Sequence, residues 1–159
     1  MTSPVDWSDE GDEPPSGEHA RRRALGDLRT LYRLADEAYR PYRCPAAAEC
    51  CQLATTGREP WLWPVEWKLL LQAAGGRAPP ARADGGCPFL DAAGARCSVY
   101  AERPFGCRTF FCHRARGPRR EPLERMAALS RRLEALARMH DPDADAPRPL
   151  RAWHSGAVP

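Results

Sequence analysis

The sequence predicts a small α-rich domain with irregular cysteine-bearing loops and little or no sheet. Two segments repeat their apolar residues at the three- and four-residue spacing of an amphipathic helix, and a third carries the start and stop signals of a helix. All seven cysteines lie within residues 44–112, where prolines and glycines interrupt any regular period. The chain of 159 residues has room for one domain, which we expect to occupy residues 18–140.

The chain begins with an acidic segment, residues 1–17, that contains prolines and glycines and no apolar run. Such a segment cannot bury enough apolar surface to offset the entropy lost on ordering, so we expect a disordered tail. From residue 18 to residue 40, leucine, alanine and tyrosine recur at helical spacing, and Pro41 ends the pattern. We therefore expect the first helix over residues 18–40, leading directly into Cys44.

A second helix is predicted over residues 64–74. Pro64 suits the first turn of a helix, Glu66 lies near the positive end of the helix dipole, and two consecutive glycines end the pattern. Before this helix, residues 52–56 show no helical period, which leaves a short strand or irregular chain as alternatives.

A third helix is predicted over residues 121–139, because leucine, methionine and alanine form one apolar stripe along it. Asp141 and Pro142 end this pattern. The remaining segment, residues 141–159, is rich in proline and lacks a period, so we expect a loose tail in which Leu150 and Trp153 could dock back.

The cysteines are arranged as in a binding site. Four of them fall between residues 87 and 112, separated by nine, nine and four residues, with prolines and aromatic residues beside them. Residues 91–96 have the composition of a tight turn, so we expect a hairpin with Cys87 on one arm and Cys97 on the other. The full set is Cys44, Cys50, Cys51, Cys87, Cys97, Cys107 and Cys112.

Three uses of these thiols compete: disulfide bonds, a metal site and inert burial. The odd number of cysteines and an acidic N-terminus without an apolar signal both speak against an oxidising compartment. Inert burial does not explain seven thiols in one short window. We therefore predict a metal-stabilised, cytoplasmic protein. No stretch of the sequence approaches the roughly eighteen apolar residues that a membrane helix needs.

The spacing of the thiols bears on the identity of the metal. Structural zinc sites usually contain C-x2-C pairs, and this chain has none. Cys50 and Cys51 are adjacent, and because neighbouring side chains tend to point apart, two irons of a cluster or two separate metals suit them better than one zinc. The pattern therefore favours an iron–sulfur cluster, with zinc as the alternative.

These motifs resemble the CxxCxxCC family of bacterial cysteine-cluster proteins, also called the YkgJ type, which are described as zinc- or iron-chelating. The family pattern opens with C-x2-C-x2-C-C, continues with a Pro-x-Glu helix start, and closes with C-P-[FL]-L, C-x-[IV]-Y, R-P and C-R-x-[FY]-x-C. The matching positions here are Cys44, Cys50, Cys51, Pro64, Glu66 and the stretch from Cys87 to Cys112. Ala47 replaces the second cysteine of the opening, so eight ligands become seven, and His113 is the nearest candidate for a substitute.

The resemblance implies that the seven cysteines are metal ligands. The same cysteine pattern occurs in flagellin lysine-N-methylases, which implies an iron–sulfur cluster of the 4Fe–4S type serving methyl transfer to protein lysines. Those relatives are longer, and this chain shows no glycine-rich strand-to-helix turn that would bind a methyl donor. The resemblance therefore implies a cofactor and leaves the reaction open.

Other side chains in or near the cysteine window are candidates for further roles. We predict that Arg108 binds the cofactor through hydrogen bonds to cluster sulfurs or to an anionic substrate, with an ion pair that holds the loops together as the alternative. The tryptophans between residues 61 and 67 are expected to shield the site from water, with a recognition platform as the alternative. The arginines of residues 114–120 are expected to form a solvated loop, and a net charge of +3 does not favour nucleic-acid binding.

The sequence thus predicts an iron–sulfur protein with a redox or protein-modification role. The alternative is a non-catalytic zinc module that presents residues 61–67 or residues 114–120 to a protein or nucleic-acid partner. A protein partner is compatible with either prediction, and a membrane is not expected.

Overall fold

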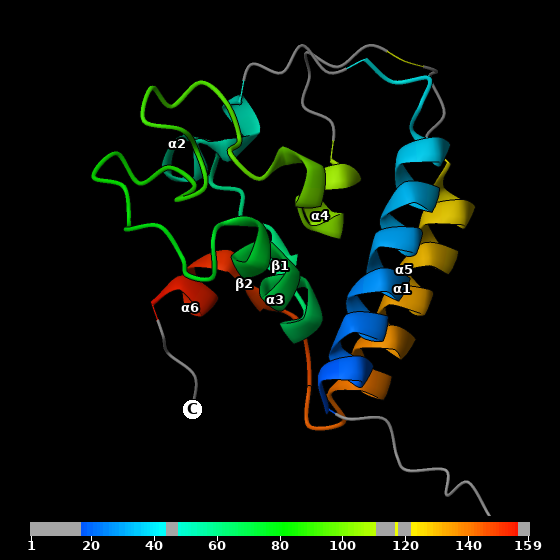
Figure 1. The fold of residues 1–159 in the computed structure, drawn as a ribbon. Coiled ribbons are helices and arrows are strands. Elements are labelled where there is room, and N and C mark those ends of the chain that lie inside the picture. The colour runs from blue at the N-terminus through cyan, green and yellow to red at the C-terminus, as the bar shows by residue number, and fades with distance from the viewer. Residues whose placement is uncertain (1–16, 44–47, 111–116, 118–121, 156–159) are drawn as a thin grey trace, which may run out of the picture.

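The structure, a computed structural model, describes residues 17–43, 48–110, 117 and 122–155. Two long helices, α1 (Gly17–Ala38) and α5 (Leu123–His140), lie side by side and antiparallel along one side of the molecule (Figure 1). The first and third predicted helices are therefore confirmed to within two residues at each end. The predicted tail over residues 1–17 lies outside the described residues except for Gly17, which begins α1.

The helices α1 and α5 pair through the apolar stripes that the sequence shows. Their buried residues recur every three or four positions, so they form one face of each helix. The buried positions are Ala24, Leu25, Leu28, Leu31, Tyr32 and Ala35 in α1, and Met126, Leu129, Leu133, Leu136 and Ala137 in α5. Together with side chains of α3 they make the larger of two hydrophobic clusters.

Helix α3 (Pro64–Ala73) confirms the second predicted helix and packs against both α1 and α5. Proline occupies its first position, where no backbone N–H is needed. The helix ends where the backbone N–H of Gly76 donates to the carbonyl of Leu71 at 2.8 Å. Gly76 has a φ of 94°, a left-handed conformation that favours glycine.

The C-terminal segment returns to the domain. Strand β2 (Arg148–Pro149) pairs antiparallel with β1 (Trp61–Leu62), and α6 (Leu150–His154) follows at once. Leu150 is only 2% exposed, and the indole of Trp153 stacks on Trp67 with ring centroids 6.1 Å apart. The sequence places residues 148–154 in a loose tail in which Leu150 and Trp153 could dock. In the structure both of these side chains pack against the domain.

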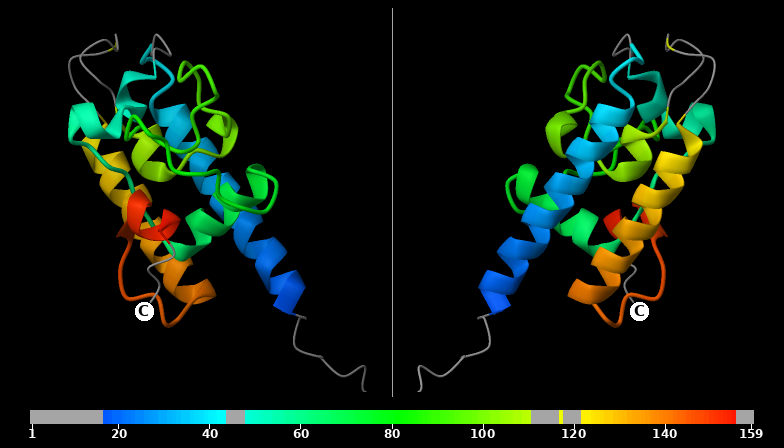
Figure 2. Two further views of the ribbon diagram at one scale, coloured as in Figure 1. Left: turned by 90° about the vertical axis from the view of Figure 1, so that its left-hand side faces the viewer. Right: turned by 90° about the vertical axis from the view of Figure 1, so that its right-hand side faces the viewer.

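The middle of the chain is irregular, as predicted, and lies beside the long helices (Figure 2). It contains two 3₁₀ turns, η1 (Glu49–Cys51) and η2 (Tyr100–Glu102), and two short helices, α2 (Leu53–Thr56) and α4 (Phe105–Arg108). The predicted α-rich fold with little sheet is confirmed. Residues 52–56, expected as a strand or irregular chain, contain α2 instead.

Within the described part of the chain, no helix has the length and apolar character needed to cross a membrane.

Candidate metal centre

Five of the seven predicted ligands fall in the described residues. Cys50 and Cys51 end the turn η1, Cys87 and Cys97 flank the hairpin turn, and Cys107 lies in α4. All five are free thiols. The other two predicted ligands, Cys44 and Cys112, and the candidate substitute His113 lie outside the described residues.

The turn η1 brings two thiols together. The Sγ atoms of Cys50 and Cys51 lie 4.0 Å apart. Ala48 precedes the turn in a left-handed conformation, with a φ of 53°, and its carbonyl accepts a hydrogen bond from the N–H of Cys51 at 2.9 Å. The expectation that neighbouring thiols point apart is wrong here, because the backbone is tightly coiled and not extended.

Backbone hydrogen bonds attach the hairpin to this turn. The N–H of Cys87 donates to the carbonyl of Cys51 at 2.7 Å. Leu90 and Cys97 then form an antiparallel bridge, and the N–H of Ser98 donates to the carbonyl of Phe89 at 2.8 Å. The predicted hairpin with a cysteine on each arm is therefore present, and its first arm is joined directly to η1.

The five thiols lie within electrostatic range of one another. Burial, together with the thiols of Cys97 and Cys50, raises the pKa of Cys87 to about 11. Burial also raises the pKa of Cys107 far above its ordinary range, and Cys87, Cys50 and Cys97 contribute in the same direction. Thiols from four separate parts of the chain therefore converge on one region.

The adjacent pair behaves differently from the other thiols. A hydrogen bond from Cys51 is the largest cause that lowers the pKa of Cys50 to about 6, and the same bond and burial raise the pKa of Cys51. The positive charges of Arg58 and Arg103 also lower the pKa of Cys50. One thiolate is thus stabilised at neutral pH before any metal binds.

Arg58 is a cation of the site that the sequence analysis did not single out. Its guanidinium donates to the carbonyl of Gly106 at 3.2 Å and lies over the ring of Phe110. Its charge acts on the thiols of both Cys50 and Cys107. No motif marks Arg58, because it precedes β1 in a segment without a period.

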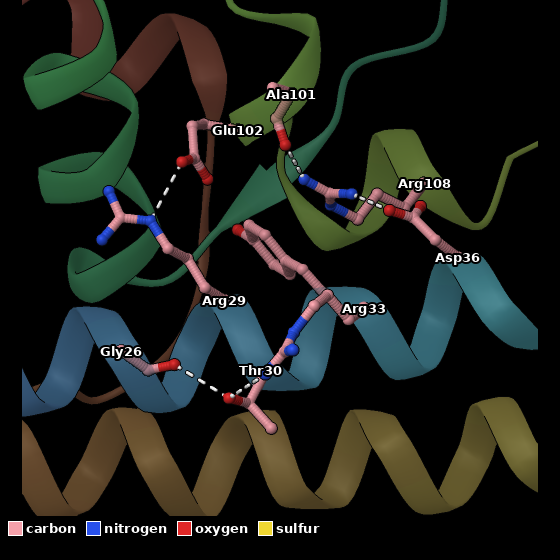
Figure 3. A pocket seen from close by; sticks show the side chains of 9 residues that line it. Gly26, Arg29, Thr30, Arg33, Asp36, Ala101, Glu102 and Arg108 are labelled. Carbon is pink, nitrogen blue, oxygen red and sulfur yellow. Dashed lines mark hydrogen bonds and ion pairs between the residues drawn. The ribbon is translucent and has the colours of Figure 1, made fainter.

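Arg108, the predicted cofactor-binding residue, is attached to α1. Its side chain is 2% exposed, and it donates to Asp36 of α1 at 2.5 Å, to the carbonyl of Arg103 at 2.8 Å and to the carbonyl of Ala101 (Figure 3). The guanidinium also lies 4.1 Å from the ring centroid of Tyr32. These contacts fasten α4 to the scaffold, so binding of a cofactor by Arg108 stays a prediction.

A surface pocket borders this arginine. The pocket has a volume of about 430 Å³ and lies between α1 and residues 101–108 (Figure 3). Two of its arginines form ion pairs, Arg29 with Glu102 and Arg108 with Asp36. A third, Arg33, donates a hydrogen bond to the hydroxyl of Thr30. The guanidinium of Arg108 is thus already paired with Asp36, and the anionic substrate considered for it stays a prediction.

Aromatic residues shield one side of the thiols. Cys87 and Cys97 pack against the smaller hydrophobic cluster, to which Trp67, Phe89 and Trp153 belong. This arrangement agrees with the shielding role expected for the tryptophans, although Trp61 is 59% exposed. The basic segment 114–120 lies outside the described residues except for Gly117.

The donor atoms of the site limit which metals it can bind. Soft thiolate ligands select zinc and the iron of iron–sulfur clusters, and the converging side chains are all thiols. Within the described residues, no three histidine, cysteine, aspartate or glutamate side chains are close enough to hold a metal ion. The residues therefore have the donor chemistry for a thiophilic metal. To complete its coordination shell, either the described thiols must move closer together or residues outside the described ranges must supply further ligands.

Part of the chain matches a known protein family. A family model described as "CxxCxxCC: Putative zinc- or iron-chelating domain" matches residues 43–128, more than half of the chain. The matched region extends from the segment after α1 into α5 and contains all seven cysteines. No curated protein and no solved structure gives a significant match.

Proposed function

Because the chain belongs to the CxxCxxCC family, whose domain is described as zinc- or iron-chelating, we propose that its cysteines hold an iron–sulfur cluster. The observation that carries this proposal is geometric: Cys50 and Cys51 share one turn, with their Sγ atoms 4.0 Å apart. The hairpin that bears Cys87 and Cys97 is joined to this turn by a backbone hydrogen bond. Five thiols exceed the four corners of one tetrahedral metal, and two more cysteines lie in the matched region. A 2Fe–2S or 4Fe–4S cluster also takes four thiolates, so the seven cysteines are enough for one centre and part of a second.

The candidate ligands are the five described cysteines together with Cys44 and Cys112, and one cluster takes four of them. Two thiolates on one tetrahedral metal at about 2.3 Å would lie about 3.8 Å apart, close to the 4.0 Å between Cys50 and Cys51. An iron of a 2Fe–2S cluster with four cysteines takes two thiolates, whereas an iron of a 4Fe–4S cluster takes one. The separation thus supports a two-iron cluster over the 4Fe–4S type that the sequence analysis favours.

The surrounding residues suit a centre of this kind. When bound, an iron–sulfur cluster supplies one-electron transfer at a potential set by charge, hydrogen bonding and exposure. The cation of Arg58 lies near two of the proposed ligands and offsets their negative charge. The smaller hydrophobic cluster, with Trp67 and Phe89, excludes water from the side of Cys87 and Cys97.

We assign this centre a redox or protein-modification role in the cytoplasm. Free thiols persist in a reducing compartment, and all five described cysteines are unpaired by disulfides. The described thiols are partly exposed, so a bound cluster would lie close enough to the surface to exchange electrons with a protein partner.

A structural zinc module is the second candidate, because the 4.0 Å separation fits two corners of a zinc tetrahedron equally well. In that case the protein would act through its surface, where Trp61 is 59% exposed on β1. Large exposed aromatic side chains are typical of protein interfaces. A protein partner is therefore the counterpart that this alternative requires.

The test is a visible spectrum of the full chain purified without oxygen, with iron, acid-labile sulfide and zinc assayed on the same sample. A coloured protein with iron and sulfide in matching amounts supports the cluster, and a colourless protein with stoichiometric zinc supports the module. Cys97→Ser should lower the metal content, whereas Ser98→Ala, one residue further on, should leave it unchanged. A chain that holds neither metal would contradict both candidates.

A further inference from the structure

A buried carboxylate, Glu66 of α3, connects three helices. Its side chain is only 1% exposed. Its Oε1 accepts hydrogen bonds from the hydroxyl of Tyr32 in α1 at 2.9 Å and from the backbone N–H of Phe105 in α4 at 2.8 Å. Its Oε2 accepts a hydrogen bond from the backbone N–H of Trp63 at 2.9 Å. One carboxylate thus accepts bonds from α1, from α4 and from the start of its own helix.

The capping of α3 explains only part of this arrangement. A glutamate at the third position of a helix commonly accepts the N–H of the capping residue, and one exposed oxygen is sufficient for that bond. Burial of a charged carboxylate is costly unless several hydrogen bonds compensate. The second oxygen is directed away from the cap, at α1 and α4, so the position of Glu66 serves the contact between helices.

The helix held in this way carries a proposed metal ligand. Phe105 is the first residue of α4 and Cys107 is the third. At the far end of α4, Arg108 is fixed to α1 by its ion pair with Asp36 and by the ring of Tyr32. Tyr32 takes part in both attachments, since its hydroxyl donates to Glu66 and its ring lies under Arg108.

We propose that Glu66 is a positioning residue of the metal centre, which holds α4 so that the thiol of Cys107 stays directed at the other thiols. The inference rests on the proposed function, because it takes Cys107 to be a ligand. Glu66 acts through the N–H of Phe105 and through Tyr32, and it does not touch the metal. Residues that orient metal ligands in this way typically change metal affinity by about 10- to 100-fold when they are replaced.

Glu66→Gln tests the role with little change in shape. The glutamine offers one acceptor oxygen to three donors, and its NH₂ group must face at least one backbone N–H. We expect the metal-loaded full chain to release its metal to EDTA about tenfold faster than the wild type. Tyr32→Phe, which removes one of the three bonds, should give a smaller acceleration in the same direction.

A double variant shows whether the effect passes through Cys107. If Glu66 acts through Cys107, Glu66→Gln should accelerate metal release in the wild-type background and should not change the rate of metal release in the Cys107→Ser background. If Glu66→Gln does not fold, the same comparison is made with Tyr32→Phe. An equal acceleration in both backgrounds would overturn the inference.

Leu136→Ala is the matched control for a loss of stability alone. Leu136 is buried in the C-terminal half of α5, a segment that lies beside the N-terminal half of α1 and away from α4 (Figure 1). Release rates are compared at a fixed interval below each variant's melting temperature. Release from Glu66→Gln at the rate of Leu136→Ala would also overturn the inference, whereas a wild-type chain that takes up neither zinc nor iron would refute the proposed function itself.

Discussion

The sulfur atoms of Cys50 and Cys51 lie 4.0 Å apart on a single 3₁₀ turn. This separation is close to the edge of a thiolate tetrahedron around one metal, which is about 3.8 Å for metal–sulfur bonds of about 2.3 Å. Within the turn, the N–H of Cys51 donates to the carbonyl of Ala48 and the N–H of Gln52 donates to the carbonyl of Glu49. Local backbone structure thus places the two adjacent thiols together.

A shared metal makes a prediction about ligand removal. Cys50→Ser and Cys51→Ser should each lose the same metal ion, so the double variant should hold no less metal than either single variant. Metal content per chain, measured by atomic emission after gel filtration, tests this expectation. Additive losses would show that the two thiols serve different metal ions.

The hydrogen bond within this pair predicts the reactivity of the metal-free protein. Because the bond from Cys51 lowers the pKa of Cys50 to about 6, Cys50 should be mostly thiolate at pH 7 and should be alkylated first by iodoacetamide. Cys51→Ser should shift the midpoint of its reaction to higher pH, and Arg58→Gln should do so to a smaller extent. Mass spectrometry over pH 5–9 gives both midpoints, and an unchanged midpoint in Cys51→Ser would contradict the role of the bond.

The other thiols predict how stability depends on pH without metal. Burial raises the pKa of Cys87 from 9.0 to about 11, so the folded state holds its proton more tightly than the unfolded state. This difference contributes up to about 3 kcal/mol to the free energy of unfolding. The contribution is fully present below pH 9 and is lost as the pH rises through 11. Urea unfolding at pH 8–11 should show this loss for metal-free protein only, because metal ligands are already deprotonated.

The sequence predicts the long helices well because each buries a periodic stripe that is visible without tertiary information. Leu28 and Leu31 of α1, for example, are spaced as one helical face and are both buried. The docking of α6 is less visible, because a helix of five residues is too short to show a period. Its position depends on Trp67 and Leu62, which lie far away in the sequence.

The sequence predicts which residue types gather in the candidate metal centre, and it does not predict their geometry. Spacing identifies which cysteines belong together, but it does not give the direction of side chains on a turn, and the expectation for Cys50 and Cys51 was wrong for that reason. Arg58 has no spacing signal. The sequence indicates only that Glu66 lies at the start of a helix, and its contacts with α1 and α4 become visible only in the folded structure.

The ion pair between Arg108 and Asp36 predicts a loss of stability that is limited by exposure. Asp36→Asn would leave a guanidinium that is 2% exposed without its anionic partner, but Asp36 itself is 43% exposed and water can partly replace it. We expect the free energy of unfolding in urea to fall by about 1–2 kcal/mol. Glu37→Gln, at the next position and in a more exposed pair with Arg40, should change it by less than about 0.5 kcal/mol.

The indole of Trp153 should stabilise the domain although it lies outside the region matched by the family model. It stacks on Trp67 and donates its Nε1–H to the carbonyl of Leu62 at 3.0 Å, so Trp153→Ala removes an aromatic contact and leaves that carbonyl without its donor. We expect the free energy of unfolding to fall by about 2–3 kcal/mol, below the range for a fully buried tryptophan because this side chain is only partly buried. Arg151→Ala, in the same helix but 56% exposed at its side chain, should cost less than about 0.5 kcal/mol. Equal stabilities for the two variants would mean that the stacked indole contributes little to the stability of the domain.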